Sequence, residues 1–444
     1  MSARARPAAV WVFTGMVLNN GIRLFSSLVL TRLLAPDLYG LMAVGNVIVS
    51  ALVMLSDIGL TQSVIQSARG EEQGFLDTIW SIRLVRGFIL AAILIAVAGL
   101  LAVLRIYTPS LVNGTYSDPR LVTILVILAA FPIADGFEST NLALQRRGVN
   151  LRPVVLIDVL SQLCATLLMV IAAYLHPALW ILPSGWVFSS LLKSVSSYAL
   201  SGSGNRFKWD AHAAREIWQF SKWILISSSL TFVYRDGDRF VLGALFNASE
   251  MGLYGVSILL LTAAKQVVSS LSGNIGLPAL AQVSRTRPEE LRRAYRRCRN
   301  PIDIFCLAAS GLMFGGADLI IKILYDTRYQ GAAPIFRLLA LILIAHRYVV
   351  FDDFLVATGN TRQLFKRGLL QVVVLLVSLP LGYRFGGMIG AVLGVLAANF
   401  SIVPLLMVLE KKSGVFDWRA ELKLLPIFFV AAGAAYALSS LILR

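Results

Sequence analysis

Residues 87–104 read GFILAAILIAVAGLLAVL, a stretch without a charged residue, and Arg86 and Arg105 stand at its two ends. A helix built from this stretch and extended back to residue 80 is long enough to cross a bilayer, which needs about 20 apolar residues. Runs of the same kind recur from Val10 to Leu443, separated by short connections rich in arginine. The stretch therefore predicts a membrane protein rather than a soluble domain.

The composition of the whole chain agrees with that prediction. Its 444 residues are 57% hydrophobic and 14% charged, with a mean hydropathy of +0.75. A soluble domain has roughly 25% charged residues. We expect an all-α polytopic membrane protein of 12–14 transmembrane helices, with spans at about 8–30, 39–62, 80–104, 121–145, 151–175, 178–201, 217–246, 251–278, 300–325, 332–358, 364–385, 387–410 and 420–443. The last of these is either a span, a hairpin or a helix lying flat.

The distribution of basic residues sets the predicted orientation. The first apolar run follows Arg4 and Arg6, is too long for a signal sequence and lacks a clear cleavage site, so we interpret it as a retained span. With the N-terminus in the cytoplasm, 27 of the 40 Lys and Arg residues fall on the inside and 7 on the outside. This is the positive-inside pattern. It accounts for the net charge of +16 without a nucleic-acid partner.

The inside loop at about 284–299 has a pattern of its own. Thr286-Arg-Pro-Glu289 resembles a capping box, and apolar residues then follow at helical spacing with arginines opposite. The pattern predicts a short amphipathic helix on the inner membrane surface. The alternative is a solvated charged linker.

The chain contains a candidate internal duplication. Leu38-Tyr-Gly40 and Leu55-Ser-Asp-Ile-Gly-Leu60 flank the second predicted span, and Leu253-Tyr-Gly255 and Leu271-Ser-Gly-Asn-Ile-Gly-Leu277 flank the eighth. Six spans separate the copies, so both halves have the same orientation. We predict an N-terminal six-helix lobe at 1–205, a C-terminal six-helix lobe at 206–412 and an additional helix at 413–444, with a substrate site between the lobes. The alternative is chance similarity between apolar helices.

Charged residues inside the spans are the candidate site residues, because each costs at least about 2.5 kcal/mol to insert. Guanidinium groups bind phosphate bidentately, so converging bases would form a cationic cavity for a phosphate or diphosphate. The candidates for this cavity are Arg23, Arg235, Arg239, Lys265 and Arg347. The alternative is buried ion pairing, which includes local pairs of Arg235 with Asp238 and of Asp236 with Arg239.

Three carboxylates are candidates for proton coupling: Asp135, Glu138 and Asp238. Asp135 and Glu138 lie on one face of the fourth span, where a dry site would raise a carboxyl pKa. We expect Asp303 and Arg337, near span ends, to extend toward the interface. The scattered Cys and His residues predict no metal site, and we expect no cofactor and no catalytic residue.

Four segments together resemble the oligosaccharide and polysaccharide flippases of the multidrug/oligosaccharidyl-lipid/polysaccharide exporter superfamily. They are Thr31–Gly40, Ala143–Arg146 with Leu151–Pro153, Asp238–Arg239 with Leu253–Gly255, and Leu324–Tyr325 with Ala332–Ala340. The resemblance implies alternating access by two six-helix lobes. It implies a lipid-diphosphate-linked oligosaccharide as substrate, moved across a bacterial inner membrane, with membrane lipids and polysaccharide polymerase or export proteins as partners.

Two other function classes compete with this expectation. A drug/cation antiporter of the same superfamily would favour an anionic set of intramembrane residues, whereas this chain has six intramembrane bases. A membrane glycan polymerase or ligase would need a sizeable outside loop for its catalytic groups. The longest predicted outside loop, at 106–120, offers Asp118 as its acid and has no histidine.

Overall fold

The computed structural model describes residues 5–200 and 204–443, apart from a few side chains in three helices, and these residues form helices joined by short connections. Among them, eight segments are long and apolar enough to cross a membrane, and one further pair of helices, bent by 74° at Gly316, would make a ninth. Each predicted span coincides with a helix or a broken helix. The predicted all-helical membrane fold is confirmed.

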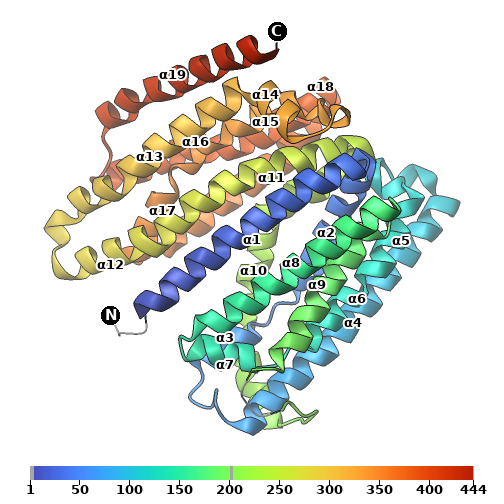
Figure 1. Cartoon of the computed structure of the whole chain (residues 1–444). Helices are drawn as coiled ribbons and strands as arrows, with labels where there is room; N and C mark the ends of the chain where they lie inside the picture. Colours follow the sequence, from blue (N-terminus) through green and yellow to red (C-terminus); the bar gives the residue numbers. More distant parts are fainter. Residues whose placement is uncertain (1–4, 201–203, 444) are drawn as a thin grey trace. The chain divides into compact units, whose positions relative to one another are not determined.

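The chain divides into two compact units, residues 1–251 and 252–444. The helices of unit 1 are α1 (Ala5–Leu33), α2 (Pro36–Leu55), α3 (Leu60–Gln66), α4 (Gln73–Tyr107), α5 (Pro119–Leu128), α6 (Ala130–Gly136), α7 (Asn141–Arg147), α8 (Leu151–Leu175), α9 (Ile181–Ser197) and α10 (Ala211–Leu245). Helix α1 packs along α8, α8 along α9, and α4 against α5 and α6 (Figure 1). Helix α10 belongs to this unit because it packs along α2, whereas the sequence assigned it to the second lobe. The predicted repeat boundary at 205/206 stays a prediction.

The end of α2 is a break inside a predicted span. Gly59 has a φ of +63°, in the left-handed region that favours glycine. Arg86 of α4 donates to the carbonyl oxygen of Val53 at 2.6 Å and to Ser56 Oγ at 3.1 Å, and Ser221 of α10 donates to the carbonyl oxygen of Ile58 at 2.5 Å. These side chains satisfy the backbone groups that the break releases, which an apolar medium requires.

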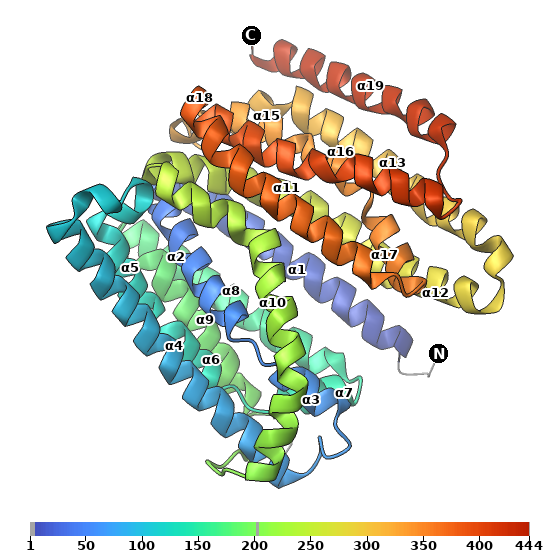
Figure 2. The ribbon, with the colours of Figure 1, turned by 180° about the vertical axis from the view of Figure 1, so that it is seen from behind.

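Unit 2 begins within α11 (Ala248–Leu271), which continues through a π-helical turn, η3 (Ser272–Gly276), into α12 (Leu277–Thr286). It goes on through α13 (Leu291–Gly315), α14 (Ala317–Leu324), α15 (Ala332–Ala340), α16 (Ile342–His346), α17 (Val349–Ala357), α18 (Thr361–Lys412) and α19 (Trp418–Leu443). Helix α19 lies along α13, and α12 packs on α17 (Figures 1 and 2). The two sequence copies at 55–60 and 271–277 thus both lie where a span is interrupted.

Helix α18 is two spans joined by a turn. Gly386 and Gly387 leave the helical conformation, and Gly387 has φ +56° and ψ −142°, a combination open to glycine alone. The two halves pack so closely that a Cβ on Gly382 would overlap the carbonyl oxygen of Gly390. This confirms the predicted break between spans 364–385 and 387–410, and it shows how small residues let two membrane helices pack closely.

The same close packing holds α19. A Cβ on Gly311 or Gly315, one helical turn apart on α13, would overlap backbone atoms of Phe428 or Ala432 on α19. The predicted additional C-terminal helix therefore packs as a long helix within unit 2 and is not a hairpin.

The predicted capping box at Thr286 is wrong. Thr286 is the last residue of α12, and its hydroxyl donates to the carbonyl oxygen of Gln282 at 2.9 Å. Residues 291–302 are helical as predicted, but they form the first turns of α13 rather than a separate surface helix. The chain turns sharply at residues 287–290, so the helix starts later than the pattern suggested.

Candidate functional site

Three of the five predicted cavity bases come together in unit 1. Arg23 of α1 lies close enough to Arg239 and Arg235 of α10 for their charges to interact. Asp236 accepts from Arg235 Nε and from Arg239 Nη1, both at 3.3 Å, so the predicted pair of Asp236 with Arg239 is present. Arg235 pairs with the adjacent Asp236. We call Arg23, Arg235, Asp236, Asp238 and Arg239 the α1/α10 cluster.

The α1/α10 cluster is an uneven charge arrangement. Its three arginines and two aspartates leave one positive charge in excess. The Asp236 side chain is 7% exposed, whereas that of Arg235 is 67% exposed. Arg23 is also exposed. The carboxylate therefore lies inside the unit and guanidinium groups extend out of it, an arrangement suited to an anionic ligand.

The other two predicted bases, Lys265 and Arg347, lie in unit 2. Lys265 of α11 makes a backbone hydrogen bond with His346, which also lies 3.3 Å from the hydroxyl of Ser269. Arg347, the next residue along the chain, is buried and bonds to Glu421 of α19. Arg347 has thus taken the ion-pair alternative that the sequence left open.

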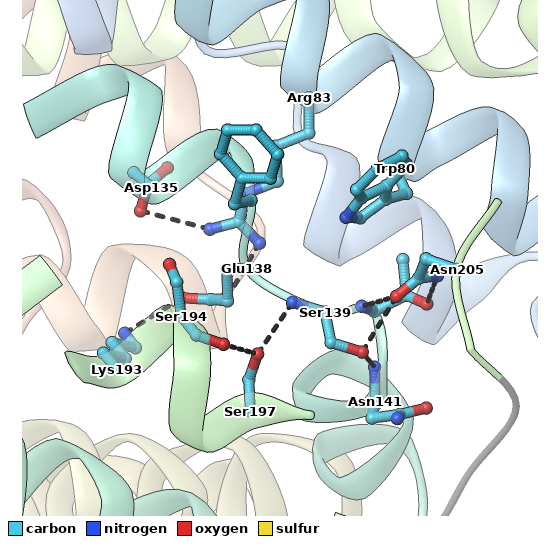
Figure 3. Close-up of polar contacts among 12 residues, drawn as sticks. Trp80, Arg83, Asp135, Glu138, Ser139, Asn141, Lys193, Ser194, Ser197 and Asn205 are labelled. Carbon is cyan, nitrogen blue, oxygen red and sulfur yellow. Dashed lines mark hydrogen bonds and ion pairs between the residues drawn. The ribbon is translucent and has the colours of Figure 1, made fainter. Parts of the chain in front are cut away.

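Asp135 and Glu138, the candidate coupling carboxylates, belong to a network at the junction of α6 and α7 (Figure 3). Arg83 of α4 donates to Glu138 Oε1 at 2.8 Å and to Asp135 Oδ1 at 3.2 Å. Lys193 of α9 lies 3.4 Å from Glu138 and 3.0 Å from Asp158 of α8. Both candidate coupling carboxylates therefore form ion pairs with cationic side chains. The coupling role stays a prediction.

The same junction carries a chain of neutral polar contacts. The backbone N–H of Ser139 donates to Ser197 Oγ at 2.8 Å, and the Ser139 hydroxyl donates to Asn205 Oδ1 at 2.8 Å (Figure 3). Asn205 Nδ2 in turn donates to Thr140 Oγ1 at 2.6 Å. The interrupted backbone at 137–140 is thereby satisfied, and the 204–210 segment is fixed to the end of unit 1.

A second ion network is buried in unit 2. Arg299 Nη1 donates to both oxygens of Glu410 at 2.7 and 2.8 Å, and Arg299 Nε lies 3.2 Å from Asp303. Arg299 also bonds to Glu421, which Arg347 bonds from the other side. We call Arg299, Asp303, Arg347, Glu410 and Glu421 the α13/α19 network. All five are less than 9% exposed, so the network ties α19 to the body of the unit.

Sequence reasoning missed most of the α13/α19 network. It counted Arg299 among the inside-loop bases, and it expected Asp303 to extend toward the interface, whereas Asp303 is buried. Arg337, the other residue expected to do so, is half-exposed and bonds to Asp318. The available signal for the network was the i, i+4 spacing of Arg299 and Asp303, which places opposite charges on one helix face.

The sequence is similar to a known protein family and to proteins of known role. Residues 29–334 match the family model described as "Polysaccharide biosynthesis protein". The succinoglycan biosynthesis transport protein ExoT of Rhizobium meliloti (strain 1021) is 23% identical over 85% of this chain and 74% of its own length. The lipopolysaccharide biosynthesis protein WzxC of Escherichia coli (strain K12) is 19% identical over 87% of this chain and 77% of its own.

Solved structures show the same fold. The lipid II flippase MurJ in an inward closed conformation has a TM-score of 0.69 at 12% identity and covers 98% of both chains. An inward-facing multidrug resistance transporter of the MATE family and MOP superfamily has a TM-score of 0.66 at 12% identity, over 90% of this chain and 94% of its own. At this identity the likeness shows the fold alone. The match of residues 29–334 to the family model confirms the resemblance to polysaccharide transporters that the sequence predicted.

Proposed function

Because the chain belongs to the polysaccharide biosynthesis protein family, we propose that it moves a lipid-diphosphate-linked oligosaccharide from the inner to the outer leaflet of the bacterial inner membrane. It does so by alternating access and without covalent chemistry, and its N-terminus lies in the cytoplasm. ExoT, a transport protein for succinoglycan biosynthesis, supports the transport role. The excess of inside arginines supports the orientation.

The observation that carries this proposal is the α1/α10 cluster. An arginine within a span is costly unless it faces protein, water or a ligand. Arg23 and Arg235 are exposed from unit 1, and each lies ten residues before the end of its helix, within a predicted span. A water-filled substrate path is the environment that lowers this cost. A diphosphate supplies the two anionic groups that the excess guanidinium charge can bind bidentately. The role of Lys265 of unit 2 as a cavity base stays a prediction.

The antiporter alternative requires a carboxylate that is available to a cation. Asp236 instead lies between Arg235 and Arg239, and Glu138 lies between Arg83 and Lys193. Each of these carboxylates already has cationic partners, which favours an anionic substrate over a cationic one.

The test is reorientation of an undecaprenyl-diphosphate oligosaccharide in liposomes that contain the purified protein. Glycan in the inner leaflet is protected from an external glycan-modifying reagent, and transport removes this protection. We expect loss of protection with the wild-type protein and with Arg328→Gln, which changes an exposed outer-loop arginine. Arg23→Gln and Arg235→Gln should slow the loss by tenfold or more while the protein stays folded.

Each outcome separates the alternatives. A glycolipid that emerges chemically altered would support a polymerase or ligase. Transport of a cationic dye with no movement of glycolipid would support the antiporter. Unchanged glycolipid transport in both Arg23→Gln and Arg235→Gln would exclude the α1/α10 cluster as the substrate site.

A further inference from the structure

The first turns of α13 form one wall of a basic groove that the proposed transport path does not use. The groove has a volume of about 1010 Å³. Its other wall is the connection that leads into α19. It is lined by Glu289, Glu290, Arg292, Arg293, Arg296, Arg297, Asn300, Phe416, Asp417 and Trp418.

The helix has two contrasting faces at this point. Tyr295 and Arg299 are buried against the core of unit 2. Arg292, Arg293 and Arg297 lie on the other side and are exposed. The groove is therefore lined by a row of arginines that project from a helix whose inner face is anchored in unit 2.

The acidic residues of the groove leave most of these arginines available. Asp417 pairs with Arg296 at 2.7 Å. Glu290 lies 3.8 Å from Arg287, outside the row. Arg292, Arg293 and Arg297 form no ion pair with any residue that the structure describes. Glu289 is the remaining acidic residue of the groove, so the three arginines leave an excess of positive charge there.

Two aromatic side chains complete the groove. Phe416 lies in the connection before α19, and Trp418 is the first residue of that helix and is 59% exposed. Tryptophan is enriched at the level of lipid head groups. In the orientation proposed above, this end of unit 2 meets the inner leaflet, so the arginines lie at head-group depth beside an aromatic anchor.

From the groove, its free arginines and its aromatic edge, we infer a binding site for the phosphate-ester head group of an inner-leaflet lipid. Basic pockets on the cytoplasmic side of membrane helices bind anionic head groups. Each guanidinium offers paired N–H donors that match two phosphate oxygens, which an ammonium group cannot do. The inference rests on the proposed orientation. Two lipids share this chemistry: an anionic phospholipid and the lipid-diphosphate substrate on its way to transport.

A simpler account is that these arginines serve membrane topology alone and are otherwise solvated. The two accounts predict different effects when these arginines are replaced by lysine. Lysine keeps the positive-inside charge and therefore the topology, but it loses bidentate phosphate binding. The triple variant R292K/R293K/R297K therefore separates them. Its matched control is R206K/R215K/R362K, which changes three exposed arginines on the same predicted side, none of which lines the groove.

The experiment uses the full-length protein in zwitterionic micelles. Brominated phosphatidylglycerol or brominated phosphatidylcholine is titrated in, and quenching of Trp418 is taken as the difference between the protein and its Trp418→Phe variant. We expect phosphatidylglycerol to quench at a concentration about tenfold below phosphatidylcholine. R292K/R293K/R297K should lose this preference, and the control triple should keep it.

Competition identifies the source of the head group. Undecaprenyl diphosphate that displaces phosphatidylglycerol at a lower concentration would assign the groove to the substrate, and weaker or equal displacement would assign it to bulk anionic lipid. Equal quenching by the two brominated lipids, or equal losses in both lysine triples, would overturn the inference. Binding is measured without transport, so such a result would leave the proposed function standing.

Discussion

Arg299 offers the sharpest test of what holds α19 in place. Its guanidinium bonds Glu410 through Nη1, Asp303 through Nε and Glu421 through Nη2. Arg299→Gln would leave three buried carboxylates with Arg347 as the remaining cation of the α13/α19 network. Each carboxylate would lose a charge-assisted hydrogen bond, and mutual repulsion among them would rise.

The expected magnitude follows from burial. Removal of one partner from a buried ion pair costs about 3–5 kcal/mol, because the remaining charge stays desolvated. Arg299 is 6% exposed, so this range applies to it. Arg297, two residues away on the same helix, is exposed and forms no ion pair with any described residue. Arg297→Gln should cost less than about 0.5 kcal/mol, as exposed substitutions do.

The assay is reversible unfolding of the purified protein in mixed micelles of increasing denaturing-detergent content. Arg299→Gln should lower the free energy of unfolding by about 3–5 kcal/mol relative to the wild type. The double variant with Glu410→Gln should lose less than the sum of the two single variants, because it removes both members of the pair. A loss below about 1 kcal/mol for Arg299→Gln, or equal losses for Arg299→Gln and Arg297→Gln, would refute this account of α19 docking.

Two further predictions concern unit 1. The backbone N–H of His212 donates to the Asp210 carboxylate and lowers the pKa of that carboxyl below its ordinary value. The stabilisation of the folded state by this hydrogen bond is present above the unfolded-state pKa of Asp210. It is lost as the pH falls through the lowered folded-state pKa. Hydrogen exchange at the His212 amide, corrected for its intrinsic rate, should therefore quicken on acidification, and Asp210→Ala should abolish that dependence; a persisting dependence would contradict the assignment. Glu138→Gln should destabilise the protein more than Asp135→Asn in the same unfolding assay. The Glu138 side chain is 6% exposed and has two cationic partners, whereas the Asp135 side chain is 41% exposed and has one. Equal losses would mean that Arg83 holds both carboxylates alike.

The span pattern could be predicted because it depends on local sequence. Residues 151–175 were predicted as a span and form α8 with those bounds. The break between the predicted spans 364–385 and 387–410 coincides with the turn within α18, where the conformation of Gly387 is open to glycine alone. In both cases the information lies in consecutive residues, because an apolar medium forces each spanning segment to satisfy its own backbone.

The partners of the charged residues could not be predicted in the same way. Arg347 was a candidate for the substrate cavity, but it bonds Glu421, which lies 74 residues further along the chain. Asp135 and Glu138 were candidates for proton coupling, but Arg83, more than 50 residues earlier, reaches both. A pattern along one helix gives the face on which a charge lies, and it does not give which helix covers that face.

The sequence by itself determined that this chain is a membrane protein, where its spans lie along the chain, and which superfamily it resembles. These follow from hydropathy, glycine and charge placed along the chain. The tertiary structure alone decided which intramembrane charges neutralise one another and which extend outward. The pairing depends on contacts between helices that are far apart in the sequence. A buried charged side chain pairs with whichever opposite charge the fold brings within hydrogen-bonding distance.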